Sequence, residues 1–274
     1  MIMKNIRTIG WVIMTVIVTA SCTKVIDLKL KDVPVRTVIQ AEILTDSFAL
    51  VRVTKTAPYL QNAPTPTITN ASVVISDDLG NTEILNHIGN GYYKGNTLVG
   101  DPARTYTLDV NAEGKDYTAT TSVPAGVPFV ITGRNYVSES EANNFHKEGY
   151  YPTIKTTLPP GDTYYLFKYY KNDTLYVPEG AEDDIFITDS KFIGTEIDGY
   201  ETPYEYKAGD VARIDIYRIT KEGYTFYNDL SAQLNNDGGF FSTPPANTST
   251  NFSNGAIGVF LGGSRETESL TIVP

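Results

Sequence analysis

The residue with the most specific chemistry in this sequence is its one cysteine, Cys22, which directly follows Thr19-Ala20-Ser21. A short basic segment with Lys4 and Arg7 and an apolar run over residues 10–18 come before it, and this order is typical of an export signal. A thiol directly after small residues is the group that a lipoprotein transferase acylates, so we expect Cys22 to become a lipidated N-terminus. An ordinary signal peptide cut nearby, with an incidental cysteine, is the alternative.

Carboxylates are the second group that could do chemistry, because a pair of them acts as acid and base in glycosidases. The candidates are Asp77 with Asp78, the acidic run over 182–184, and Asp215 in a strand pattern. Asp77 and Asp78 also suit a turn, the acidic run suits a solvated loop, and neither has the regular spacing of a calcium loop. A carboxylate-based hydrolase is therefore our third functional hypothesis, and an acidic pair that binds calcium or catalyses remains an open alternative.

Other catalytic and metal-binding patterns are missing from the sequence. The two histidines, His87 and His146, have no second ligand at a metal-binding spacing, and we interpret both as surface residues. No Gly-x-Ser-x-Gly, His-Glu-x-x-His or phosphate-binding glycine motif occurs. We therefore predict no catalytic residue, no metal, no cofactor and no enzymatic activity.

Tyrosines are the remaining candidates, and they favour binding over catalysis. Several lie in a strand pattern over 164–170, where alternation sends half of the rings into a core. Tyr200, Tyr204 and Tyr206 instead lie in a segment with glycine and proline that we predict to be a loop. Exposed tyrosines on a rigid loop suit recognition of a protein or a sugar, because each ring adds contact area at low entropy cost. Packing of this loop against its own domain is the alternative.

Composition indicates the class of fold that positions these residues. The 19 Tyr, 11 Phe, 22 Gly and 15 Pro favour strands and turns. No cysteine follows Cys22, so each domain must be stable through its hydrophobic core without a disulfide. Loss of residues 1–21 removes Lys4 and Arg7 and changes the formal net charge from −10 to −12, which argues against a nucleic-acid partner. We predict an all-β protein.

The strand patterns fall into two groups. We expect strands in the first group at 35–44, 48–56, 72–77, 82–87, 92–94, 105–110 and 117–123, and in the second at 129–136, 151–158, 164–171, 184–190, 211–220, 257–260 and 270–273. Short strands with turns between them predict an immunoglobulin- or transthyretin-like sandwich for the first group. The one helical pattern covers 221–235, where Thr220 can cap the start.

The predicted organisation follows from these groups. It comprises a lipoprotein signal peptide (1–21), a lipidated tether with a first strand (22–34), an immunoglobulin-like sandwich (35–125) and a second β-rich domain with one amphipathic helix (126–274). One continuous β-domain is the alternative, because the linker is short.

Several segments together resemble a known family. They are Val25-Ile26-Asp27-Leu28, Lys55-Thr56-Ala57-Pro58-Tyr59, Ala71 to Asn81, Pro244-Pro245-Ala246-Asn247 and Asn254 to Gly258. In this order they resemble the Bacteroidota lipoprotein family catalogued as domain of unknown function 4249. The resemblance implies an exported β-sandwich lipoprotein, often encoded beside TonB-dependent outer-membrane receptors, and it carries over no catalytic residue.

Our leading hypothesis is a non-enzymatic outer-membrane lipoprotein that works with a TonB-dependent barrel as an accessory or ligand-capturing subunit. The lipid on Cys22 would hold the protein at the membrane, facing either the periplasm or the cell surface. The second hypothesis is a free-standing surface module or adhesin that binds a glycan or peptide through Tyr200, Tyr204 and Tyr206.

Overall fold

The computed structural model describes residues 34–57, 64–144, 146–236 and 246–274. Cys22, the signal peptide and the tether lie outside the described residues. From Val35 to Pro274 the chain forms one compact unit that is mostly strand, so the all-β prediction is confirmed. The division into domains at 35–125 and 126–274 stays a prediction.

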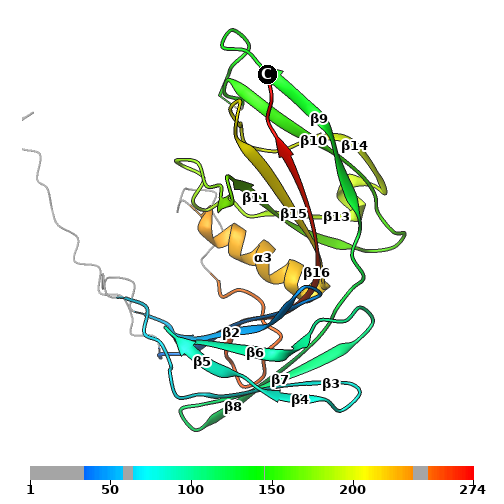
Figure 1. The fold of residues 1–274 in the computed structure, drawn as a ribbon. Helices are drawn as coiled ribbons and strands as arrows, with labels where there is room; N and C mark the ends of the chain where they lie inside the picture. The colour runs from blue at the N-terminus through cyan, green and yellow to red at the C-terminus, as the bar shows by residue number, and fades with distance from the viewer. Residues whose placement is uncertain (1–33, 58–63, 145, 237–245) are drawn as a thin grey trace, which may run out of the picture. The chain divides into compact units, whose positions relative to one another are not determined.

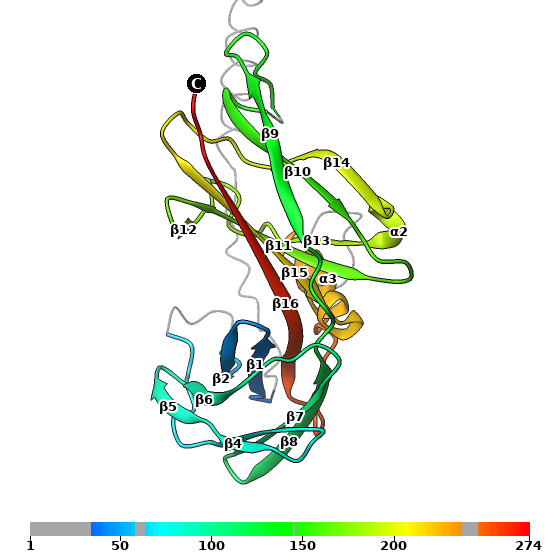
Figure 2. The same ribbon diagram turned by 45° about the vertical axis from the view of Figure 1, so that its right-hand side comes forward.

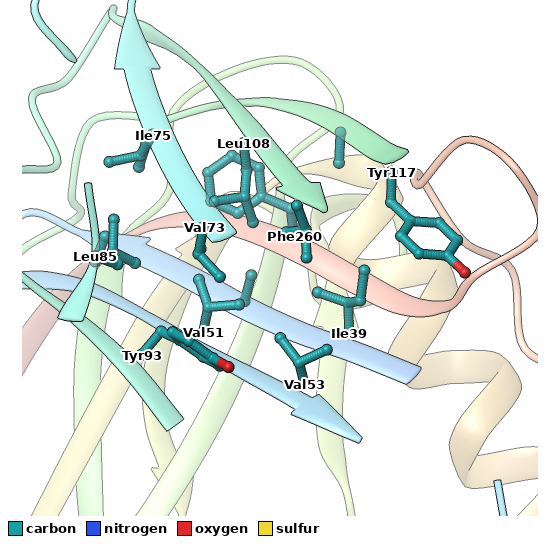
Figure 3. Close-up of a cluster of buried hydrophobic side chains, with 14 of the residues drawn as sticks. Ile39, Val51, Val53, Val73, Ile75, Leu85, Tyr93, Leu108, Tyr117 and Phe260 are labelled. Atoms are coloured by element: carbon teal, nitrogen blue, oxygen red, sulfur yellow. The ribbon is translucent and has the colours of Figure 1, made fainter. Parts of the chain in front are cut away.

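The first part of the chain forms a sandwich of two antiparallel sheets (Figure 1). The strands predicted at 35–44 and 48–56 are present and pair as an antiparallel hairpin. One layer contains β1 (Thr37–Leu44), β2 (Ser47–Lys55), β6 (Tyr92–Val99) and β5 (Asn86–Gly89), and the other contains β4 (Thr82–Ile84), β3 (Ser72–Asp77), β7 (Thr105–Ala112) and β8 (Lys115–Ser122). Alternation along each strand sends Ile39, Val51, Val73 and Leu108 into the shared core shown in Figure 3. This arrangement is an immunoglobulin-like β-sandwich.

The single strand predicted at 82–87 is wrong, because the structure divides it between the two layers. β4 pairs with β3, whereas β5 pairs with β6 in the opposite sheet. Leu85 lies between them, buried, and its amide donates to the Val73 carbonyl at 2.9 Å. The chain crosses between layers without a turn residue, so the sequence pattern does not mark the change.

The second part of the chain packs a three-stranded sheet against an extension of the first sheet. The small sheet contains β14 (Glu196–Glu201), β10 (Gly149–Thr157) and β9 (Phe129–Val137). Facing it are β12 (Thr174–Leu175), β11 (Tyr164–Lys171), β13 (Phe186–Asp189) and β15 (Val211–Ile219). Phe129, Ile154, Phe167 and Ile214 belong to the core between the two sheets.

One long strand, β16 (Ile257–Thr271), belongs to both parts (Figure 1, red). Its first half pairs in parallel with β1, its second half pairs antiparallel with β15, and Gly263 takes part in both ladders. The sequence predicted two separate closing strands at 257–260 and 270–273, and this is wrong. Glycine and polar residues lie between these two segments, and backbone atoms of neighbouring residues pack against the middle of β16. A hydropathy pattern therefore does not reveal one continuous strand.

The predicted helix is present as α3 (Lys221–Leu234), and the Thr220 hydroxyl accepts from the Gly223 amide at 3.3 Å as its N-cap. A second helix that the sequence did not predict, α2 (Ser190–Ile193), joins β13 to β14 (Figure 2). Its single turn is too short to show a helical period. In the described part of the chain, neither helix is long and apolar enough to cross a membrane.

Candidate functional site

A hollow of about 390 Å³ lies where the second sandwich is open at its edge, between β13, α2 and β14. Its apolar lining includes Ile154, Phe167, Ile193 and Ile197, all of which belong to the core or pack against it. This volume falls in the range of pockets that hold small ligands, ~300–1,000 Å³. The hollow is therefore large enough to hold a small ligand.

Tyr200 reaches this hollow because β14 contains a bulge. Ile197 lies opposite Thr156 and Asp198 lies opposite Lys155, but the next residue to find a partner is Tyr200, which lies opposite Ile154. Gly199 is left without a partner on β10, with φ of +77°, a conformation that glycine adopts at little cost. Strict alternation from Ile197 would place Tyr200 on the outer face, so the bulge turns it inward.

The mouth of the hollow carries two exposed rings. Tyr200 keeps 48% of its surface exposed, and its ring centroid is 6.4 Å from that of Phe167. Phe192, on α2, is 87% exposed. Asp189 caps this turn by accepting from the Phe192 amide at 2.9 Å, which fixes the backbone that presents the ring. Burial raises the pKa of the Tyr200 phenol, so the hydroxyl stays protonated at neutral pH.

The polar groups of the hollow are few. Glu196 and Asp198 are among its lining residues, and the Lys155 ammonium lies 2.6 Å from Asp198, whose hydrogen bond raises the pKa of Lys155. Thr188 also lines the hollow, and its hydroxyl oxygen is buried without a hydrogen-bond partner. An apolar surface with a small number of polar groups is typical of binding pockets.

The other two predicted tyrosines do not share this exposure. Tyr206 is 0% exposed, and its hydroxyl donates to the Tyr170 carbonyl at 3.3 Å. Tyr204 is half-buried and donates to the Asp184 carboxylate at 3.0 Å. Burial, first of all, raises the pKa of both phenols. The predicted loop is wrong for Tyr200, which lies in strand β14, and the expected exposure is wrong for Tyr206, which packs in a core. A binding role for Tyr200 stays a prediction.

The carboxylates proposed as acid and base are occupied by other partners. Arg104 contacts Asp77 at 2.7 Å and Asp78 at 2.5 Å. A hydrogen bond from Asn81 lowers the pKa of Asp77, and one from Arg104 lowers the pKa of Asp78.

Asp215 is held inside the large sheet. It is 1% exposed, accepts from the Thr267 hydroxyl at 3.0 Å and lies 3.4 Å from the Arg213 guanidinium. A carboxylate that is buried and paired in this way has no contact with solvent through which a substrate could reach it.

The described residues contain no cluster of His, Cys, Asp or Glu that could hold a metal ion. The acidic run over 182–184 is exposed, His87 packs on Tyr93 with ring centroids 5.2 Å apart, and His146 lies 3.6 Å from Glu201.

Sequence reasoning missed Phe192, the most exposed ring of the hollow. Its surroundings, Asp189-Ser190-Lys191-Phe192, read as part of a strand and a polar loop. A signal was available in Asp189, since Asp before a short polar segment is a common helix cap.

The strand order defines the class of protein as an immunoglobulin-like β-sandwich protein with a second β-rich part. The chain belongs to the family described as domain of unknown function (DUF4249), whose model matches residues 23–269. Among solved structures, a two fibronectin type-III domain segment from chicken tenascin is similar at 13% identity over 87% of this chain and 100% of that chain. The TM-score of this match is 0.22. No curated protein matches the sequence.

Proposed function

We propose that the chain is a non-enzymatic, lipid-anchored protein that captures a ligand in the hollow beside Tyr200. The observation that carries this proposal is the pair of exposed rings, Phe192 and Tyr200, at the mouth of an unfilled apolar cavity. Covering a large exposed side chain contributes about 1.5–3 kcal/mol, so a ligand that buries Phe192 gains affinity directly. The bulge at Gly199 supports the proposal, because bulges often redirect a side chain beside a site.

The carboxylates favour binding over hydrolysis. A general acid that works near neutral pH needs a raised pKa. Among the described Asp and Glu residues, each resolved shift is downward, at Asp77, Asp78, Glu83, Glu141 and Asp210. These carboxylates stay ionised, and each has hydrogen-bond donors that stabilise the ionised form.

We further infer a Bacteroidota lipoprotein in the outer membrane, anchored by acyl chains on Cys22. The export signal, the position of the thiol and the family membership support this inference. A protein held there with a cavity for a ligand suits the role of accessory subunit to a TonB-dependent transporter. The alternative is a free-standing glycan- or peptide-binding module or adhesin, supported by the exposure of Tyr200 and Phe192 at the hollow.

Co-purification distinguishes these two roles. The tagged full-length protein would be extracted from its native outer membrane in mild detergent, and the proteins recovered with it would be identified. A TonB-dependent barrel in stoichiometric amount supports the accessory role. Recovery of the protein alone contradicts that role and leaves the free-standing module. Cys22→Ser serves as a control, because it removes the lipid anchor. A protein that is recovered only because it shares the membrane should no longer be recovered with this variant.

A further inference from the structure

We propose that the ligand of this hollow is a neutral carbohydrate, whose sugar ring packs its C–H face on Tyr200 and Phe192. This inference rests on the proposed function and names the chemical class of its ligand. Aromatic faces carry partial negative charge, and the C–H groups on one face of a sugar ring carry partial positive charge, so the two attract each other. Both residues line the same hollow, and both side chains are exposed.

The carboxylates of the hollow select for hydroxyl donors. Glu196 and Asp198 line the same cavity as the rings, and the Lys155 ammonium already donates to Asp198 at 2.6 Å. An ionised carboxylate can only accept hydrogen bonds, so the acceptor without such a partner is Glu196. Sugar hydroxyls donate such bonds without carrying charge. The chain has a net charge of −10, which disfavours acidic sugars, nucleotides and other anionic ligands.

Thr188 offers a further contact. Its hydroxyl has no hydrogen-bond partner in the wall of the hollow. Rotation about χ1 moves the hydroxyl to another staggered position, and here that rotation breaks no hydrogen bond. A hydroxyl that reaches the hollow in this way can donate to or accept from a ligand hydroxyl.

A peptide is a weaker candidate for the same hollow. An extended peptide gains most of its affinity by adding a strand to an open sheet edge. β14 is such an edge strand, but the bulge at Gly199 interrupts its ladder in the middle of the hollow. Bulges of this kind blunt an edge against strand addition.

The test is isothermal titration of the full-length protein with neutral oligosaccharides of glucose, mannose, galactose and xylose. Polygalacturonate and peptides containing Phe and Arg are titrated in parallel. We expect at least one neutral oligosaccharide to bind and Tyr200→Ala to weaken it by about tenfold or more. Tyr136→Ala is the matched control, because Tyr136 is 51% exposed on β9 and does not line the hollow.

Thr188→Val separates a ligand contact from a structural role. Because valine replaces an unpaired buried hydroxyl, the variant should fold at least as stably as the wild type while sugar affinity falls about three- to tenfold. Binding of peptides or polygalacturonate alone, with the same dependence on Tyr200, would overturn the carbohydrate inference and leave the proposed function standing. Absence of any binding that depends on Tyr200 would overturn both.

Discussion

Tyr200 lies opposite Ile154 in the β10–β14 ladder, on the side of the sheet that faces the core. Ile154 is buried, so its cross-strand partner points in the same direction. At an edge strand, however, nothing covers the Tyr200 ring, which remains half exposed. The pairing thus turns a core position into a surface that a ligand can contact.

Deletion of Gly199 should leave Tyr200 facing the hollow. Without the unpaired residue, Ile197, Asp198 and Tyr200 alternate strictly, so Tyr200 stays on the same face as Ile197 and opposite Ile154. We expect ligand binding to persist in the deletion variant, whereas Tyr200→Ala loses it, and titration with the ligand measures both.

Gly199→Ala is the control for this deletion. It keeps the bulge, and the added methyl group meets nothing within 4 Å, but the positive φ costs ~1 kcal/mol for a residue with a side chain. Binding should therefore persist in Gly199→Ala. Loss of binding in the deletion variant alone would contradict this register of β14 on β10.

Glu83 should make a larger contribution to stability than an ordinary strand residue. It is 7% exposed, and its carboxylate accepts from the backbone amides of Asn96, Thr97 and Leu98. Gly95 permits this contact, since a Cβ there would lie 2.9 Å from the carboxylate. We expect Glu83→Ala to lower the free energy of unfolding by about 2–3 kcal/mol and Glu83→Gln by less, measured by urea unfolding at pH 7.

The same carboxylate predicts a pH dependence. Burial acts to raise the pKa of Glu83, but the amide hydrogen bonds outweigh it and lower the pKa below its ordinary value of 4.5. The stabilisation is therefore complete above pH 4.5 and is lost as the pH falls through the lower folded-state pKa. Wild type should lose more stability between pH 7 and pH 3 than Glu83→Gln does, and parallel curves for the two proteins would contradict this.

Gly258 pairs with Ile39 in the parallel β1–β16 ladder, and no side chain should be tolerated at this position. Its φ is +119°, and a Cβ would lie 1.9 Å from the Ile39 carbonyl oxygen. Gly114 also has positive φ, +76°, but open space around it, so Gly114→Ala reports the backbone cost alone, ~1 kcal/mol. We expect Gly258→Ala to destabilise the protein by at least ~2 kcal/mol more in thermal unfolding, and similar effects at both sites would refute the packing argument.

Cys22→Ser tests the anchor. We expect the variant to lose incorporation of labelled palmitate and to move from the membrane fraction to the soluble fraction, because serine offers no thiol for acylation. Thr19→Leu keeps the thiol and should remain in the membrane. A Cys22→Ser protein that still fractionates with the membrane would show that another part of the chain holds it there.

The sequence predicted most of the fold because its strands alternate cleanly. The segment 164–171 coincides with β11, and the Thr220 cap correctly marked the start of α3. The site was harder to predict. Tyr200 was identified by its type, but its inward direction depends on a bulge at Gly199 that alternation cannot reveal, and Tyr206 was misjudged because its burial depends on contacts with β11. Phe192 was missed, since one turn of helix carries no period.

The most direct test of the central claim is a fluorine NMR spectrum of the full-length protein labelled with 4-fluorophenylalanine, in which Phe192→Leu assigns one of 11 phenylalanine resonances. Neutral glycans, acidic glycans and peptides would be added in turn. A site at the hollow predicts that at least one class shifts the Phe192 resonance, that Tyr200→Ala abolishes the shift and that Tyr136→Ala leaves it unchanged. A Phe192 resonance that responds to none of them, or that responds equally in Tyr200→Ala, would contradict ligand capture at this hollow.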